Sequence, residues 1–179
     1  MAKIEEINNM KELLSKSLVL LNKNDKDLIE LQEDIVEYSS ELEKFERKLH
    51  EVCINHRLAC YIELLLPQYF TGDYKVDIEY NRYYKNKKHL TIDNEIAIVR
   101  PDIIVHTRAK QLSLPQHLLI IEAKKNITST DDAKVVKSFI QDNHYQYVFG
   151  ATIRYNDFVH PQITLYYKDC NNTLQFVTL

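Results

Sequence analysis

The sequence predicts an α/β protein in which a mixed β-sheet core is flanked by helices and preceded by an N-terminal helical arm. The first third of the chain spaces its apolar residues as helices do, and it contains neither glycine nor proline before Pro67. β-branched and apolar runs follow, with a capped helix between two of them. Runs of strands interrupted by a helix are typical of an α/β sandwich with a mixed sheet.

The N-terminal third is expected to form two or three helices. The first should cover about residues 4–21, because the polar run 22–25 provides turn and cap formers. A second helix should begin near Asp25, whose carboxylate can accept hydrogen bonds from helix N–H groups as an N-cap. Ser39 and Ser40 could separate it from a third helix, and Pro67 ends the helical region.

These helices define the first of two predicted domains, a helical arm or hairpin over residues 1–48. The second domain is an α/β unit over residues 49–179. The arm has more apolar positions than a lone helix can leave exposed. Its helices are therefore expected to pack on each other, on the α/β unit, or across a two-fold axis as a homodimer.

After Pro67 the pattern changes to strands. The segment 74–80 alternates polar and apolar residues, whereas 117–124 contains a continuous apolar run, as in a strand buried on both faces. A helix should start after Thr128-Ser129-Thr130 and end near Asn143. The remaining strands are expected at 96–99, 103–105, 145–154, 163–168 and 173–179.

Composition excludes several classes of protein. The 179 residues suit one domain of ordinary size, and the 2 glycines cannot build a glycine-rich phosphate loop or a dinucleotide fingerprint. The 3 cysteines lack the close spacing of a zinc knuckle. No apolar run approaches the ~18 residues of a membrane span, and the acidic N-terminus is unlike a signal peptide. We therefore expect a cytoplasmic protein with no membrane partner.

Charge is distributed unevenly along the chain. The formal net charge is −3, yet residues 80–125 carry 9 lysines and arginines against 4 acidic residues, with three tyrosines among them. Basic and aromatic side chains together can bind phosphates and stack on bases, although a solvated loop surface is the alternative interpretation. The candidate substrate-binding residues of this segment are Arg82, Lys85, Lys87, Lys88 and Arg108. Arg57, on the preceding helix, is a further candidate, with a buried hydrogen-bonded pair that ties the helix to the sheet as the alternative.

Two carboxylates interrupt apolar strands. Asp102 precedes Ile103-Ile104-Val105, and Glu122 closes an apolar run, where a carboxylate is unfavourable unless cations or hydrogen bonds compensate it. Lys124 shares a strand face with Glu122. On adjacent strands, the two acids would form an oxygen site for Mg²⁺, beside a lysine that can orient or deprotonate water. The alternative is a structural ion pair of Glu122 with Lys124 or Arg100.

Pro101-Asp102 and Glu122-Ala123-Lys124 resemble the motif of the PD-(D/E)XK nuclease superfamily, which has the restriction-endonuclease-like fold. Two further runs, His56-Arg57-Leu58-Ala59 and Glu79-Tyr80-Asn81-Arg82, resemble a bacterial, largely uncharacterised branch of it. The resemblance covers roughly residues 25–155. Ala123 is smaller than the residue that the family usually has between the acid and the lysine.

The resemblance implies a metal-dependent endonuclease. Asp102 and Glu122 match the metal-binding acids, Lys124 matches the catalytic lysine, and Glu51 is the best match to an additional metal-binding glutamate from a helix. The implied cofactor is Mg²⁺, for which Mn²⁺ can substitute, and the implied substrate is nucleic acid, with DNA favoured over RNA. Two alternatives remain: a non-enzymatic nucleic-acid-binding or assembly protein that retains the fold, and a helical interaction module.

Overall fold

The protein is described by a computed structural model over residues 2–30, 40–83, 86–92, 95–108, 115–124, 130–155 and 161–179, with side chains 29–30, 40–50 and 82–87 excepted. The helices are α1 (Ile4–Asn24), α2 (Asp27–Glu30), α3 (Ser40–Leu65), a 3₁₀ turn (Leu66–Gln68) and α4 (Thr130–Gln141). The strands are β1 (Lys75–Ile78), β2 (Arg82–Tyr83), β3 (Asn86–Lys87), β4 (His89–Ile92), β5 (Glu95–Ile98), β6 (Ile103–His106), β7 (His117–Lys124), β8 (Phe149–Arg154), β9 (Gln162–Lys168) and β10 (Leu174–Thr178).

Six strands form one mixed sheet in the order β1-β6-β7-β8-β9-β10. β7 and β8 pair in parallel, whereas the other four pairs are antiparallel. A parallel pair needs a crossover connection, and α4 supplies it. The prediction of an α/β protein with a mixed sheet is therefore confirmed.

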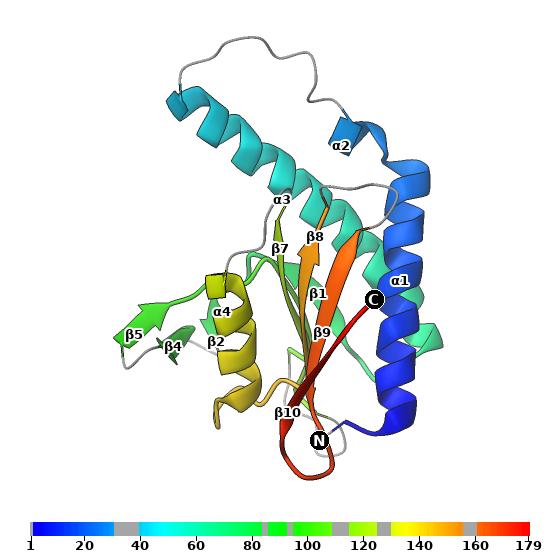
Figure 1. The fold of residues 1–179 in the computed structure, drawn as a ribbon, viewed down its shortest axis with the longest axis vertical. Coiled ribbons are helices and arrows are strands. Elements are labelled where there is room, and N and C mark those ends of the chain that lie inside the picture. The colour runs from blue at the N-terminus through cyan, green and yellow to red at the C-terminus, as the bar shows by residue number, and fades with distance from the viewer. Residues whose placement is uncertain are drawn as a thin grey trace.

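Helices cover both faces of this sheet (Figure 1). α1 and α3 lie on one face, and α4 lies on the other with the β4–β5 hairpin beside it. Two apolar clusters fill the layers between them. The first includes Leu13, Leu14, Ile54, Leu58, Ile103 and Ile121. The second includes Leu90, Ile104, Ile120, Val136, Phe139 and Ile140.

Close packing of α4 on the sheet depends on a glycine in β8. A Cβ atom built on Gly150 would lie 2.3 Å from Cγ1 of Val136 and 3.0 Å from Cδ1 of Ile140. Real Cβ atoms do not approach other carbons so closely, so the absence of a side chain lets the helix lie directly on the strand.

The N-terminal helices agree with the prediction in one respect and differ in others. α1 buries its apolar face against α3 and the sheet, which is one of the predicted arrangements, whereas α3 runs continuously across residues 48–49. Asp25 does not use its side chain as the expected N-cap. Its carboxylate instead accepts hydrogen bonds from Arg57, at 2.8 Å, and from the hydroxyl of Tyr61. A homodimer through these helices stays a prediction.

The segment between β1 and β6 has more structure than the sequence predicts. β2 pairs with β3 and β4 pairs with β5, whereas only residues 96–99 were expected to form a strand here. Short strands of two residues give no alternating pattern to detect.

In the part of the chain that the structure describes, no helix is long and apolar enough to cross a membrane.

Candidate functional site

The register of β6 against β7 brings the two candidate carboxylates together. Ile103 pairs with Ile121 and Ile104 with Ile120, so one further step places Asp102 opposite Glu122. Residues directly opposite in antiparallel strands project to the same face with Cβ atoms about 4.5–5.5 Å apart. The two acids therefore meet on the face of the sheet that carries Ile104, Ile120 and α4.

Contacts of Asp102 hold this arrangement in place. Its Oδ2 atom accepts a hydrogen bond of 2.8 Å from the backbone N–H of Ala123 and lies 3.7 Å from Nζ of Lys124. The structure thus brings Asp102, Glu122 and Lys124 into one cluster, the three residues that the sequence singled out.

The two carboxylates strongly disfavour carrying charge at the same time. Burial raises the pKa of Glu122 well above its ordinary value, and the charge of Asp102 raises it further. Burial also raises the pKa of Asp102, although the Ala123 N–H and Lys124 oppose this rise. Acids that share a buried site have raised pKa values because burial and a neighbouring negative charge both disfavour ionisation.

The same acidic surroundings favour the charged form of Lys124. Burial lowers the pKa of its amine, but the charges of Asp102, Glu51 and Glu122 outweigh burial and raise it. The lysine is therefore a stable cation at neutral pH.

Two more acids lie near the cluster. Glu51 on α3 raises the pKa of Asp102 through its charge, as does Asp132 in the first turn of α4. The sequence pointed to Glu51 through the resemblance, but it treated Asp132 only as part of a helix start. The position of Asp132, in the first turn of the helix that follows Lys124, could have indicated from the sequence that it lies near the cluster.

A second basic residue was also missed. Arg154 pairs with Lys124 in the parallel register of β7 and β8, and Thr152 pairs with Glu122. Parallel partners share a face of the sheet, so Arg154 lies beside the lysine at the same end. The sequence contained the signal, since Arg154 ends an apolar strand just as Lys124 does.

The predicted substrate-binding side chains that the structure describes, those of Arg57, Lys88 and Arg108, each contact a different set of partners. Arg57 donates to Asp25 at 2.8 Å, and Arg108 donates to Asp77 through Nε at 3.2 Å. Both arginines therefore belong to intramolecular ion pairs, although Arg108 keeps 61% of its side chain exposed. Lys85 and the side chains of Arg82 and Lys87 lie outside the described residues.

Lys88 corrects the expectation of a basic loop that faces substrate. Its side chain is fully buried, and Nζ donates a hydrogen bond of 3.0 Å to the hydroxyl of Tyr147. Nζ also lies 5.5–5.8 Å from the ring centres of Tyr80, Phe139 and Tyr147. The amine is enclosed by Tyr80, by Phe139 of α4 and by Tyr147, which precedes β8, and this burial lowers its pKa to about 8.

The acidic cluster meets only part of the requirements for a metal centre. Among the described residues, no group of three or more His, Cys, Asp or Glu side chains is placed to hold a metal ion. The paired carboxylates of Asp102 and Glu122 supply two oxygen donors, which suits Mg²⁺ because that ion usually keeps several waters.

The alternative ion pair of Glu122 with Arg100 is not formed in the described structure, where Arg100 contacts Glu79 at 3.2 Å.

Comparisons with protein-family models, with curated proteins and with solved structures find no match to this chain.

Proposed function

We propose that this protein is a metal-dependent nuclease that hydrolyses phosphodiester bonds of nucleic acid, with DNA favoured over RNA. The observation that carries the proposal is the pair of buried carboxylates, Asp102 and Glu122, facing each other across β6 and β7 with Lys124 beside them. The mixed sheet with helices on both faces supports the restriction-endonuclease-like core that the resemblance implies.

The electrostatics of the pair support a divalent cation as cofactor. Burial raises the pKa of both carboxyl groups, and the charge of Asp102 raises that of Glu122 further, so a bound divalent cation would favour ionisation of the pair. Asp102 and Glu122 would hold Mg²⁺ or Mn²⁺, and Glu51 is close enough to influence the same charges. Such an ion supplies an activated water and screens phosphate charge.

The role of Lys124 follows from its raised pKa. A lysine that stays protonated at neutral pH is a poor base, so Lys124 acts as a cation. Its amine can donate hydrogen bonds to the attacking water or to a phosphate oxygen and neutralise negative charge there. Arg154, on the adjacent strand, adds a second positive charge at this end of the sheet.

The test is cleavage of single- and double-stranded DNA and RNA with Mg²⁺ or Mn²⁺, comparing wild type with Asp102→Ala and Lys124→Ala. We expect Asp102→Ala to abolish cleavage and metal binding, because it removes one of the two paired oxygen ligands. Lys124→Ala should lower turnover by about 100-fold or more while metal binding persists. Asp73→Ala is the matched control, since that exposed aspartate pairs only with nearby Lys75 in the described structure.

Cleavage that continues undiminished in Asp102→Ala would refute the proposed site. A second candidate function is a non-enzymatic nucleic-acid-binding protein with the same fold. It is favoured by the finding that no three acidic, histidine or cysteine side chains of the described residues converge on one ion. Binding of DNA or RNA in a gel-shift assay, without cleavage of any substrate, would favour this second function.

A further inference from the structure

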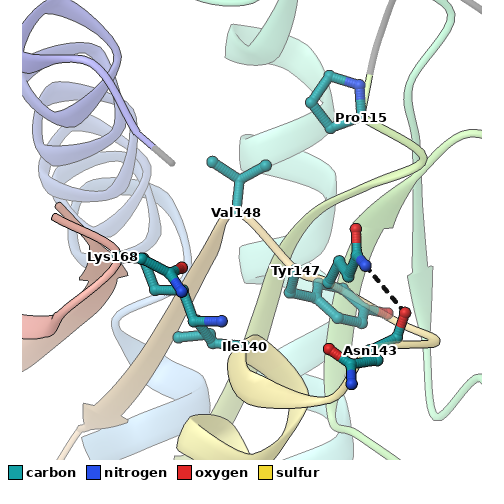
Figure 2. Close-up of a pocket in the computed structure, with 8 residues that line it drawn as sticks. Pro115, Ile140, Asn143, Tyr147, Val148 and Lys168 are labelled. Atoms are coloured by element: carbon teal, nitrogen blue, oxygen red, sulfur yellow. Dashed lines mark hydrogen bonds between the residues drawn. The ribbon is translucent and has the colours of Figure 1, made fainter. Parts of the chain in front are cut away.

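A pocket lies at the opposite end of the sheet from the carboxylates (Figure 2). Pro115 and Val148, which precede β7 and β8, line it, whereas Glu122 and Lys124 lie at the far end of β7. Seven residues separate Pro115 from Glu122, which is roughly 20 Å of extended chain at about 3.3 Å per residue. The pocket is therefore distinct from the candidate nuclease site.

The size and lining of this pocket suit a small organic molecule. Its volume is about 460 Å³, within the range of ~300–1,000 Å³ that is usual for ligand pockets. The apolar part of the lining consists of Pro115, Ile140 and Val148, together with the ring of Tyr147. The polar part consists of Lys168 and three side-chain amides, from Asn143, Gln146 and Asn172.

The charge of the lining favours an anion. Lys168 is basic, and none of the eight lining residues has a carboxylate. The two aspartates in the adjoining turns use their carboxylates locally. Asp142 accepts hydrogen bonds from the N–H groups of His144 and Tyr145, and Asp169 accepts them from those of Asn171 and Thr173.

The walls of the pocket are held in an unusual backbone conformation. Gln146 has φ of 49° and Asn172 has φ of 60°, and both line the pocket. Asparagine adopts this left-handed region readily, whereas for Gln146 it is unfavourable by about 1 kcal/mol or more, and residues held in this way tend to occur at functional sites.

Hydrogen bonds within the protein hold Gln146 and Asn172 in this backbone conformation. Nε2 of Gln146 donates to the carbonyl of Asn143 at 2.9 Å, the bond drawn in Figure 2, and its N–H donates to the carbonyl of Asp142 at 3.0 Å. The N–H of Asn172 donates to the carbonyl of Asp169 at 3.0 Å. Both turns are thus ordered by contacts within the protein itself, which reduces the entropy that a ligand must lose on binding.

We propose that this pocket binds a small organic anion, whose carboxylate or phosphate group lies at Lys168 and the neighbouring amides and whose apolar part packs on Ile140, Val148 and Pro115. The amide side chains donate hydrogen bonds to anionic oxygens without adding charge, and the lysine neutralises the ligand. The inference does not depend on the nuclease proposal, because it shares no residue with that site.

The test is titration of the ¹⁵N-labelled full chain with inorganic phosphate, a nucleoside monophosphate and benzoate, followed by NMR. We expect saturable shifts of the Asn143, Gln146 and Asn172 signals with at least one probe. Stronger binding of benzoate would identify a carboxylate ligand, and stronger binding of the two phosphate probes would identify a phosphate ligand. Lys168→Gln should weaken this binding about tenfold or more, because it removes the charged donor.

Two further variants keep the test decisive. Asn172→Gly removes the side-chain amide while allowing positive φ, so it should fold normally and weaken binding. Lys75→Gln is the matched control, since the amine of Lys75 contacts Asp73 and Lys75 does not line the pocket, so this variant should bind as wild type does. The proposal is overturned if no probe gives saturable shifts at the pocket, or if Lys168→Gln and Asn172→Gly both bind as tightly as Lys75→Gln.

Discussion

Replacing Lys88 with methionine should change how stability depends on pH. Burial lowers the pKa of Lys88 from 10.5 to about 8, so the folded state holds this proton less tightly than the unfolded state. The wild type is consequently less stable below pH 8 and gains stability as the pH rises from 8 toward 10.5. Methionine has similar length and no proton to lose, so Lys88→Met removes this dependence.

The size of the effect follows from the two pKa values. A difference of one pKa unit corresponds to about 1.4 kcal/mol, and linkage gives a gain of about 2.5 kcal/mol for the wild type between pH 7 and pH 10. For a chain of this length, that gain corresponds to roughly 5–10 °C in melting temperature. In the variant, the hydroxyl of Tyr147 loses the hydrogen bond that Lys88 donates. Burial raises the pKa of Tyr147 well above its ordinary value of 10, so the free energy lost with this bond is the same from pH 7 to pH 10.

The assay is urea unfolding of wild type and Lys88→Met at pH 7, 8, 9 and 10, monitored by circular dichroism. The free energy of unfolding of the wild type should rise relative to that of the variant by about 2.5 kcal/mol over this range. Lys75→Met is the control, because Lys75 lies at the surface with Asp73 and should parallel the wild type. Parallel profiles for wild type and Lys88→Met would show that the amine is not buried as described.

Three other substitutions test separate parts of the structure by thermal unfolding. Glu122→Gln should stabilise the metal-free protein more at pH 8 than at pH 5, because the raised pKa of Glu122 makes its ionisation unfavourable to folding as the pH rises. Stabilisation by Mg²⁺ should be lost in this variant. Equal effects at both pH values would contradict this. Gly150→Ala should destabilise the protein by about 1–3 kcal/mol, because the new methyl group overlaps Val136, and an unchanged melting temperature would mean that α4 can shift. Asp77→Asn should destabilise the protein by about 1 kcal/mol at pH 7, because Arg108 and His106 pair with the Asp77 carboxylate and lower its pKa. The carboxylate becomes protonated as the pH falls, so the difference in stability between wild type and variant should shrink at pH 3.

Strong local patterns made most of the sheet predictable. The apolar run 117–124 and the β-branched run 103–105 correspond to β7 and β6, and the polar start after Thr130 corresponds to α4. Asp102 and Glu122 could be paired from the sequence because each marks the end of an apolar strand. Their direct opposition needed the register, which depends on side-chain packing across strands that the sequence does not specify locally.

Other features depended on contacts between distant segments. Nothing near Lys88 in the sequence distinguishes it from Lys87, yet Tyr147 and Phe139, more than 50 residues later, enclose its amine. The same holds for Asp25, whose carboxylate contacts Arg57 and Tyr61 on α3 instead of capping a helix. Arg154 joined the candidate site only because β8 pairs in parallel with β7.

The segment between β1 and β6, residues 79–102, begins and ends at neighbouring positions of the sheet. Ile78 pairs with Ile103, and the N–H of Glu79 donates to the carbonyl of Asp102 at 2.9 Å, so residues 80–101 leave and rejoin the sheet at one point. The segment is thus a module that can be exchanged without moving Asp102 along its strand. Chimeras that graft a different segment between Glu79 and Asp102 should keep the carboxylate pair in register, provided that the graft supplies apolar side chains to cover α4 where Leu90 now packs. Under the proposed nuclease function, this attachment would let substrate contacts in the segment vary without moving the carboxylate pair.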